Sequence, residues 1–108
     1  MDMANYILRI LRSQPMILFS WGFHNPVALA NNEGLRFSVE GFKFKGTVEI
    51  VYNETWDLFN VHFIKNGKVI YTIEEIYLDG LVQVIDDYVE KTDDYENRVK
   101  EEYSLIMF

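Results

Sequence analysis

The 108-residue sequence contains no cysteine, two prolines and two histidines, and its 10 basic residues are outnumbered by 17 acidic residues. The lack of cysteine excludes disulfide scaffolds, thiolate metal sites and cysteine nucleophiles, and it fits the reducing environment of the cytoplasm. The net charge of −7 argues against a protein that binds the nucleic-acid backbone or an anionic membrane surface.

No long apolar run is present either. The most apolar stretch, Met16–Phe23, is eight residues long and is interrupted by Ser20, whereas a membrane-spanning helix needs about 20 residues. The N-terminal residues carry Asp2 early and Arg9 and Arg12 late, the reverse of the charge order in a secretory signal. We therefore expect a cytoplasmic protein.

Apolar and aromatic residues, in contrast, are plentiful, at 49% and 16% of the chain. A chain of this length buries roughly 60–68% of its unfolded surface on folding, which is enough for a hydrophobic core of its own. This composition excludes disorder as the default. Residues 1–108 are predicted to form a single domain.

Two segments have the apolar spacing of amphipathic helices. The first covers residues 2–13, with Asp2 as the predicted N-cap. The second begins at Asp79, its predicted cap, and reaches about Tyr103, either as one helix or as two that break near Thr92. The predicted stripes are Met3, Tyr6, Ile7, Ile10 and Leu11 in the first, and Leu81, Ile85, Tyr88, Thr92, Tyr95, Val99 and Tyr103 in the second.

The central part of the chain has the patterns of β-strands. Met16–Phe23 is a short continuous apolar run, which predicts a strand covered on both faces. His24–Gly34 contains several turn sequences and is predicted to be a long loop. Four further segments alternate apolar and polar side chains and predict strands at residues 35–39, 42–52, 59–64 and 69–73.

These elements predict a fold. Consecutive strands with short links form an antiparallel meander, and two amphipathic helices need one face of a sheet to cover. The predicted fold is a two-layer α+β domain with an N-terminal helix, a curved sheet of about five strands and a C-terminal helix. Cystatin-like and PH-like proteins share such an architecture, but the analogy implies no function.

The last hairpin poses a question of register. A two-residue Asn-Gly turn would leave Val69, Tyr71 and Ile73 on the solvent face of the sheet. A three-residue loop with Gly67 in the left-handed conformation shifts the pairing by one residue, which moves all three to the face that carries Phe63. We predict the three-residue loop, because it buries more apolar side chains.

Charge is concentrated near the C-terminus, where nine acidic and three basic residues lie between positions 79 and 102. Asp86 and Asp87 are predicted on the outer face of the helix. The acidic face either keeps the protein soluble or docks a basic protein, because complementary charge speeds and selects encounters. For the docking interpretation, Asp86, Asp87 and Glu90 are candidate contact residues.

No motif for catalysis, cofactor binding or metal binding stands out. His24 and His62 lack the spacing of metal ligands, and no serine lies in a nucleophile elbow. Gly41–Gly46 lacks a phosphate-binding signature and is predicted to be a hairpin. We therefore expect no enzyme, no cofactor and no metal. His24, which opens the long loop, remains a candidate binding residue.

Aromatic and apolar side chains supply the other candidates. Most aromatic residues are predicted to be core, but Trp21 borders the long loop and Trp56 lies in a predicted turn, where an exposed ring is a common binding anchor. The apolar tail at residues 104–108, with Leu105 and Phe108, either folds onto the sheet, completes a dimer or is captured by another protein.

Three segments carry a resemblance to a group of proteins: Ser20–Phe23, Gly34–Phe42 and Tyr52–Phe59. Their aromatic and glycine positions resemble those of small proteins of unassigned function from gut Bacteroides-type bacteria. The resemblance covers about the central half of the chain. It implies a bacterial, intracellular protein and carries over no activity and no site residue.

The sequence therefore predicts a non-enzymatic protein-interaction module, with another protein or a second copy as the partner. An alternative is a small-ligand-binding domain with its pocket between the sheet and the first helix, near Trp21 and His24. A third hypothesis is a hydrolase or isomerase that uses one of the histidines with a carboxylate. The candidate contact residues are Trp21, His24, Trp56, Asp86, Asp87, Glu90, Leu105 and Phe108.

Overall fold

The computed structural model of the chain describes residues 2–90. The helices of this part are α1 (Met3–Arg12), α2 (Pro15–Ser20) and α3 (Leu81–Val89), with 3₁₀ turns η1 (Ala30–Asn32) and η2 (Leu78–Gly80). The strands are β1 (His24–Ala28), β2 (Gly34–Glu40), β3 (Lys45–Asn53), β4 (Leu58–Lys65) and β5 (Lys68–Ile76).

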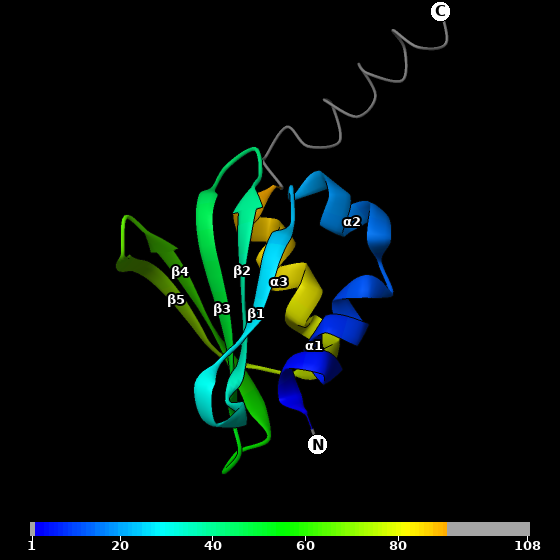
Figure 1. Cartoon of the computed structure of the whole chain (residues 1–108), viewed down its shortest axis with the longest axis vertical. Coiled ribbons are helices and arrows are strands. Elements are labelled where there is room, and N and C mark those ends of the chain that lie inside the picture. The colour runs from blue at the N-terminus through cyan, green and yellow to red at the C-terminus, as the bar shows by residue number, and fades with distance from the viewer. Residues whose placement is uncertain (1, 91–108) are drawn as a thin grey trace, which may run out of the picture.

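The five strands form one antiparallel sheet in the order β1-β2-β3-β4-β5. Figure 1 shows α1, α2 and α3 on the same side of this sheet. The predicted α+β fold, a meander with helices on one face, is confirmed. Because the order is that of a simple meander, β1 and β5 are the two edge strands.

Helix α1 follows its apolar spacing. Met3, Ile7 and Leu11 are buried against the sheet, and the backbone N–H of Asn5 donates to the side chain of Asp2 over 3.3 Å. This bond satisfies one of the N–H groups that every helix start leaves without a partner. The predicted helix and its cap are confirmed.

The predicted strand at Met16–Phe23 is wrong, because α2 occupies most of this segment. Pro15 takes the first helical position, where its missing N–H needs no partner. Leu18 and Trp21 are buried, whereas Phe19 between them is exposed, which is the spacing of a helix. A continuous apolar run fits a buried strand and a short helix equally well.

The predicted loop at His24–Gly34 is also wrong, since its first half is β1. Asn25 has a positive φ of 53°, and the pairing with β2 shifts between His24 and Val27. This bulge accommodates Pro26, which an edge strand tolerates because its outer side needs no ladder hydrogen bond. The Asn-Pro sequence therefore marks an irregular edge strand.

The β4–β5 turn is the two-residue turn Asn66-Gly67, both with positive φ, so the predicted three-residue loop is wrong. Tyr71 nevertheless lies opposite Phe63 as predicted, because the pairing shifts at a bulge in β5. Val69, on the turn side of the bulge, lies opposite Ile64 and is 56% exposed. The prediction that Val69 is buried is therefore wrong.

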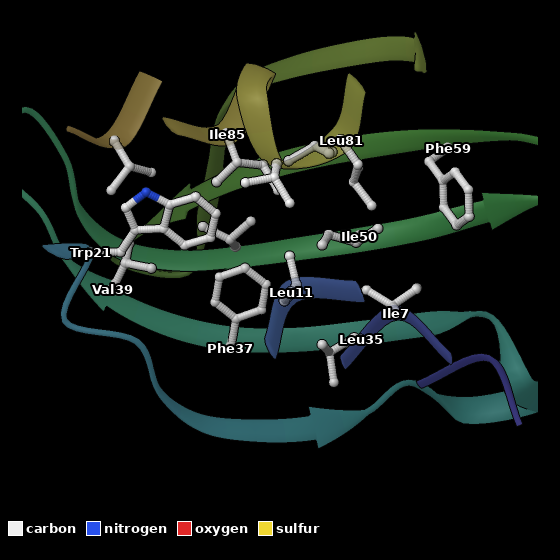
Figure 2. Close-up of a cluster of buried hydrophobic side chains, with 14 of the residues drawn as sticks. Ile7, Leu11, Trp21, Leu35, Phe37, Val39, Ile50, Phe59, Leu81 and Ile85 are labelled. Atoms are coloured by element: carbon white, nitrogen blue, oxygen red, sulfur yellow. The ribbon is translucent and has the colours of Figure 1, made fainter. Parts of the chain in front are cut away.

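The hydrophobic core fills the space between the sheet and the helices, and Figure 2 shows its side chains converging from both layers. The labelled core residues are Ile7, Leu11, Trp21, Leu35, Phe37, Val39, Ile50, Phe59, Leu81 and Ile85.

Helix α3 begins one residue later than predicted. Its N-cap is Gly80, and the predicted cap, Asp79, lies inside η2. The predicted buried stripe is confirmed at Leu81 and Ile85. The next member, Tyr88, is partly buried against the core. The members from Thr92 onward and the predicted break near Thr92 lie outside the described residues.

The turn between β2 and β3 holds the C-terminal end of α3. The backbone N–H groups of Lys43 and Phe44 donate to the carbonyl of Val89 over 2.9 and 3.3 Å. The N–H of Phe42 donates to Glu90 Oε2 over 2.6 Å. Carbonyl groups at a helix end have no partner within the helix, so this turn caps α3. The side chain of Phe42, predicted to face the core, is exposed.

Gly41 allows this close approach. A Cβ atom at position 41 would lie 2.4 Å from Val89 Cγ1 and 2.5 Å from the Val89 carbonyl oxygen. We expect Gly41→Ala to lower the free energy of unfolding by about 1–3 kcal/mol, the usual cost of overpacking. Urea unfolding followed by circular dichroism measures this change.

Gly80→Ala is the matched control, because a Cβ atom there would meet nothing within 4 Å. We expect its effect to be much smaller. Equal losses for the two variants would contradict the capping role of the β2–β3 turn.

Candidate functional site

The predicted contact residues Trp21 and Asp86 lie together inside the domain. Trp21 is fully buried, and its indole Nε1 donates to Asp86 Oδ1 over 2.9 Å. The prediction that Asp86 faces outward is therefore wrong. This arrangement leaves the Trp21 ring no surface for contact with another molecule, and it ties Asp86 to the core.

The other acidic candidates on α3 also make contacts within the domain. Glu90 accepts the N–H of Phe42. Asp87 accepts from Gln83 Nε2 over 3.0 Å, and its backbone carbonyl accepts from Lys43 Nζ. Only Asp87 among these acids is exposed. The acidic face of α3 therefore serves the fold as well as the surface.

The remaining candidates are scattered. His24 is exposed at the start of β1 and donates from Nδ1 to the carbonyl of Gly22 over 2.7 Å. Trp56, 71% exposed, lies in the β3–β4 turn at the end of the sheet opposite α2 (Figure 1). Leu105 and Phe108 lie outside the described residues. These side chains do not form one site.

A groove that the sequence did not predict runs between β5 and α3. It is a shallow groove, open to solvent, with a volume of about 230 Å³. Strand β5, which supplies two of its lining residues, is an edge strand of the sheet. Its lining residues are Tyr71, Ile73, Val84, Asp87 and Tyr88.

Aromatic stacking fixes the floor of this groove. The ring of Tyr88 lies 5.0 Å from that of Tyr71, with an angle of 8° between the planes, and 4.0 Å from that of Phe63. Phe44 contacts the same cluster, 5.5 Å from Tyr88. Because two of these rings belong to the core, the groove is preformed rather than dependent on mobile side chains.

Exposed apolar residues continue from the groove along β5. Val69, Ile70 and Tyr71 are 56%, 50% and 49% exposed. The sequence pattern did not indicate this surface, because the alternating apolar residues of β5 predict a buried face. The Asn66-Gly67 sequence was the signal that could have found it, since Asn-Gly is the preferred two-residue hairpin turn.

A pocket of about 210 Å³ lies at the start of α1, between that helix and the sheet. Tyr52 Oη donates to Asp57 Oδ1 across it over 2.6 Å. This hydrogen bond, with burial and the negative charge of Asp57, raises the pKa of Tyr52 above its ordinary value of 10.0. The lining residues are Met3, Tyr6, Tyr52, Asp57, Phe59 and Leu78.

The sheet face away from the helices carries a polar row. Arg36 Nε donates to Glu49 Oε1 over 2.7 Å, Glu49 lies opposite His62, and His62 Nδ1 lies 2.9 Å from Thr72 Oγ1. The histidine hypothesis thus has one carboxylate beside His62. No pocket described for residues 2–90 includes this row.

Residues 2–90 lack the features of two other classes of site. No helix in this part is long and apolar enough to cross a membrane. No group of three or more His, Asp or Glu side chains in the same part could hold a metal ion.

Comparison of the chain with protein-family models, curated proteins and solved structures finds no significant match. The resemblance to Bacteroides-type proteins stays a prediction.

The Tyr52–Asp57 bond makes a titration prediction. We expect Asp57→Ala to lower the pKa of Tyr52 toward its ordinary value, because the acceptor and its charge are removed. Glu54→Gln, which removes a charge but keeps the hydrogen bond, should have a smaller effect. NMR titration of the Tyr52 ring carbons measures both, and equal shifts would contradict the dominant role of the hydrogen bond.

The sign of the pH effect on stability follows. A raised pKa means that the folded chain keeps the Tyr52 proton to a higher pH than the unfolded chain. This contribution to stability is present below pH 10.0 and decreases as the pH rises through the folded-state pKa.

Proposed function

We propose that this protein is a non-enzymatic protein-interaction module of the cytoplasm. It binds an extended segment of another protein chain along β5, beside the acidic helix α3. The observation that carries this proposal is the apolar groove between β5 and α3, which adjoins the edge of the sheet.

Strand addition explains why the edge and the groove lie together. An edge strand has backbone N–H and C=O groups that no neighbouring strand pairs. An added segment would pair with these groups, while its alternate side chains enter a pocket beside the strand. In this protein Tyr71 and Tyr88 line that pocket, and tyrosines supply large contact area at low entropic cost.

Charge favours a basic segment. Asp87 lines the groove, Glu74 and Glu75 lie on β5, and the chain as a whole has a net charge of −7. Negative charge around a groove attracts basic chains and raises their association rate. In this proposal Asp87 carries the docking role predicted for the acidic helix. The role predicted for Leu105 and Phe108 remains a prediction.

The test uses lysine substitutions on the two edges of the sheet. Ile70→Lys places a charge on the exposed part of β5, and Val27→Lys does the same on β1, where Val27 is 54% exposed. Proteins retained from the native source by the immobilised wild-type chain are identified by mass spectrometry. Their affinities for all three chains are then measured with purified material.

We expect Ile70→Lys to weaken binding at least about tenfold, equivalent to about 1.4 kcal/mol, and Val27→Lys to bind like the wild type. Binding that resists both substitutions, or that both weaken equally, would show that β5 is not the contact surface. Raising the salt concentration should weaken wild-type binding, because exposed charges are screened.

A second candidate function, small-ligand binding, is favoured by the pocket at Tyr52. The pocket lies between α1 and the sheet, as the alternative prediction required, but at the opposite end of the domain from Trp21. Its aromatic rings and the Asp57 carboxylate suit a small organic cation, since aromatic faces attract cations. Its volume of about 210 Å³ is below the usual range for ligand sites, about 300–1,000 Å³.

Titration with choline followed by NMR tests this candidate. We expect saturable shifts at Tyr6 and Tyr52 that Asp57→Ala abolishes. Isosteric neutral 3,3-dimethylbutanol serves as the control ligand. Shifts of equal size with both ligands would mean that no cation site exists.

A further inference from the structure

The helices α1 and α2 differ in charge from the rest of the protein. Residues 3–32, which include both helices, contain two arginines, Arg9 and Arg12, and no Lys, Asp or Glu. All 17 acidic residues of the chain, and the other eight of its 10 basic residues, lie elsewhere in the sequence. In a chain with a net charge of −7, this segment is therefore positively charged.

Both arginines lie on the outer side of α1. Ile7 and Leu11 are buried against the sheet, and a helix has 3.6 residues per turn, so Arg9 lies on the opposite side of the helix and Arg12 is its neighbour there. Both arginines are exposed. No ion pair between residues 2 and 90 involves either of them.

Two large apolar side chains follow in α2. Met16 and Phe19 are 78% and 84% exposed, more than any other large apolar residue of the described part of the chain. They are three residues apart and so are neighbours on the helix surface. Only Ser13 and Gln14 separate α1 from α2, and both helices cover the same face of the sheet (Figure 1). The two arginines and the two apolar side chains therefore share the outer surface of the helix layer.

These residue types are typical of a protein–protein interface. The centres of such interfaces are enriched in aromatic residues, methionine and arginine and are depleted in lysine, aspartate and glutamate. Residues 3–32 have both features. Burial of apolar area is favourable, so a partner that covers Met16 and Phe19 gains free energy.

We propose that Arg9, Arg12, Met16 and Phe19 form a docking surface, the α1–α2 surface, for an amphipathic helix of another protein with an acidic polar side. Charge complementarity selects the acidic side chains, because an arginine binds a carboxylate through two parallel hydrogen bonds. The apolar side of the partner helix covers Met16 and Phe19. A helix is the fitting form, because the side of a helix has no unpaired backbone groups to which a strand could be added.

The α1–α2 surface is separate from the groove at β5. Helix α1 contacts β1 and β2, whereas the groove lies between α3 and β5, at the other edge of the sheet. The groove is proposed to take a basic segment, and the α1–α2 surface takes an acidic one. The inference therefore goes beyond the proposed function and does not depend on it.

Two synthetic peptides test the proposal on the full chain. Each forms a helix of about five turns, roughly 18 residues, with leucine on one side. The polar side carries glutamate in the first peptide and lysine in the second. NMR spectra of the isotope-labelled chain follow the signals of Arg12, Met16 and Phe19 during each titration.

We expect the glutamate peptide to shift these signals saturably and the lysine peptide to leave them unchanged. Phe19→Ser and Arg12→Glu should each weaken binding of the glutamate peptide at least about fivefold. The matched controls Val27→Ser and Lys45→Glu make the same kinds of change at exposed positions of the sheet and should bind like the wild type. Circular dichroism checks that all four variants fold.

Three results would overturn the proposal: no saturable shift at millimolar glutamate peptide, equal binding of the two peptides, or binding that Phe19→Ser leaves unchanged. Two other occupants are tested in parallel. Shifts at Phe19 with phosphatidylserine vesicles and none with the glutamate peptide would show that the surface binds lipid. A wild-type dimer in sedimentation velocity that Phe19→Ser abolishes and the glutamate peptide does not displace would show that the occupant is a second copy. Either result would also overturn the proposal.

Discussion

The buried indole of Trp21 joins the parts of this domain that no regular element connects. Its backbone carbonyl accepts the N–H of Glu40 over 2.7 Å, which attaches the end of α2 to β2. Its ring stacks on Phe37 at 6.3 Å, and its Nε1 donates to Asp86 on α3. One residue thereby connects two helices to the sheet through its backbone and its side chain. The groove between β5 and α3 depends on this attachment, because it exists only where α3 is held at a fixed position.

Much of the fold could be predicted because periodicity records which face of an element is buried. The stripe of Ile7 and Leu11 predicted α1, and alternation through Phe59 and Phe63 predicted β4, since in each case one side faces a core and the other faces water. Segments without such contrast could not be assigned. In Met16–Phe23 nearly every residue is apolar, so the segment has no alternation of apolar and polar residues that could distinguish a helix from a strand.

The candidate site was harder to predict than the fold for a related reason. Assigning alternate residues of a strand to the same face of the sheet assumes regular pairing. A bulge reverses that assignment beyond it, and no residue type identifies the bulge in the sequence. At the β4–β5 hairpin the shift occurs at Ile70 rather than at Gly67, so Val69 is exposed although it has the residue type of a core position. Likewise, Asp86 has the residue type of a surface position, and only the arrival of Trp21 from a distant part of the chain accounts for its inward contact.

The fluorescence of the two tryptophans reports separately on the interior and on the surface of the molecule. Trp21 has no exposed surface, whereas Trp56 is 71% exposed at the other end of the sheet. Iodide in solution collides with an exposed indole and not with one enclosed in protein. The intrinsic fluorescence of this chain therefore has one fraction that reports on the solvent around the β3–β4 turn and a second that becomes quenchable only when α2 leaves the sheet.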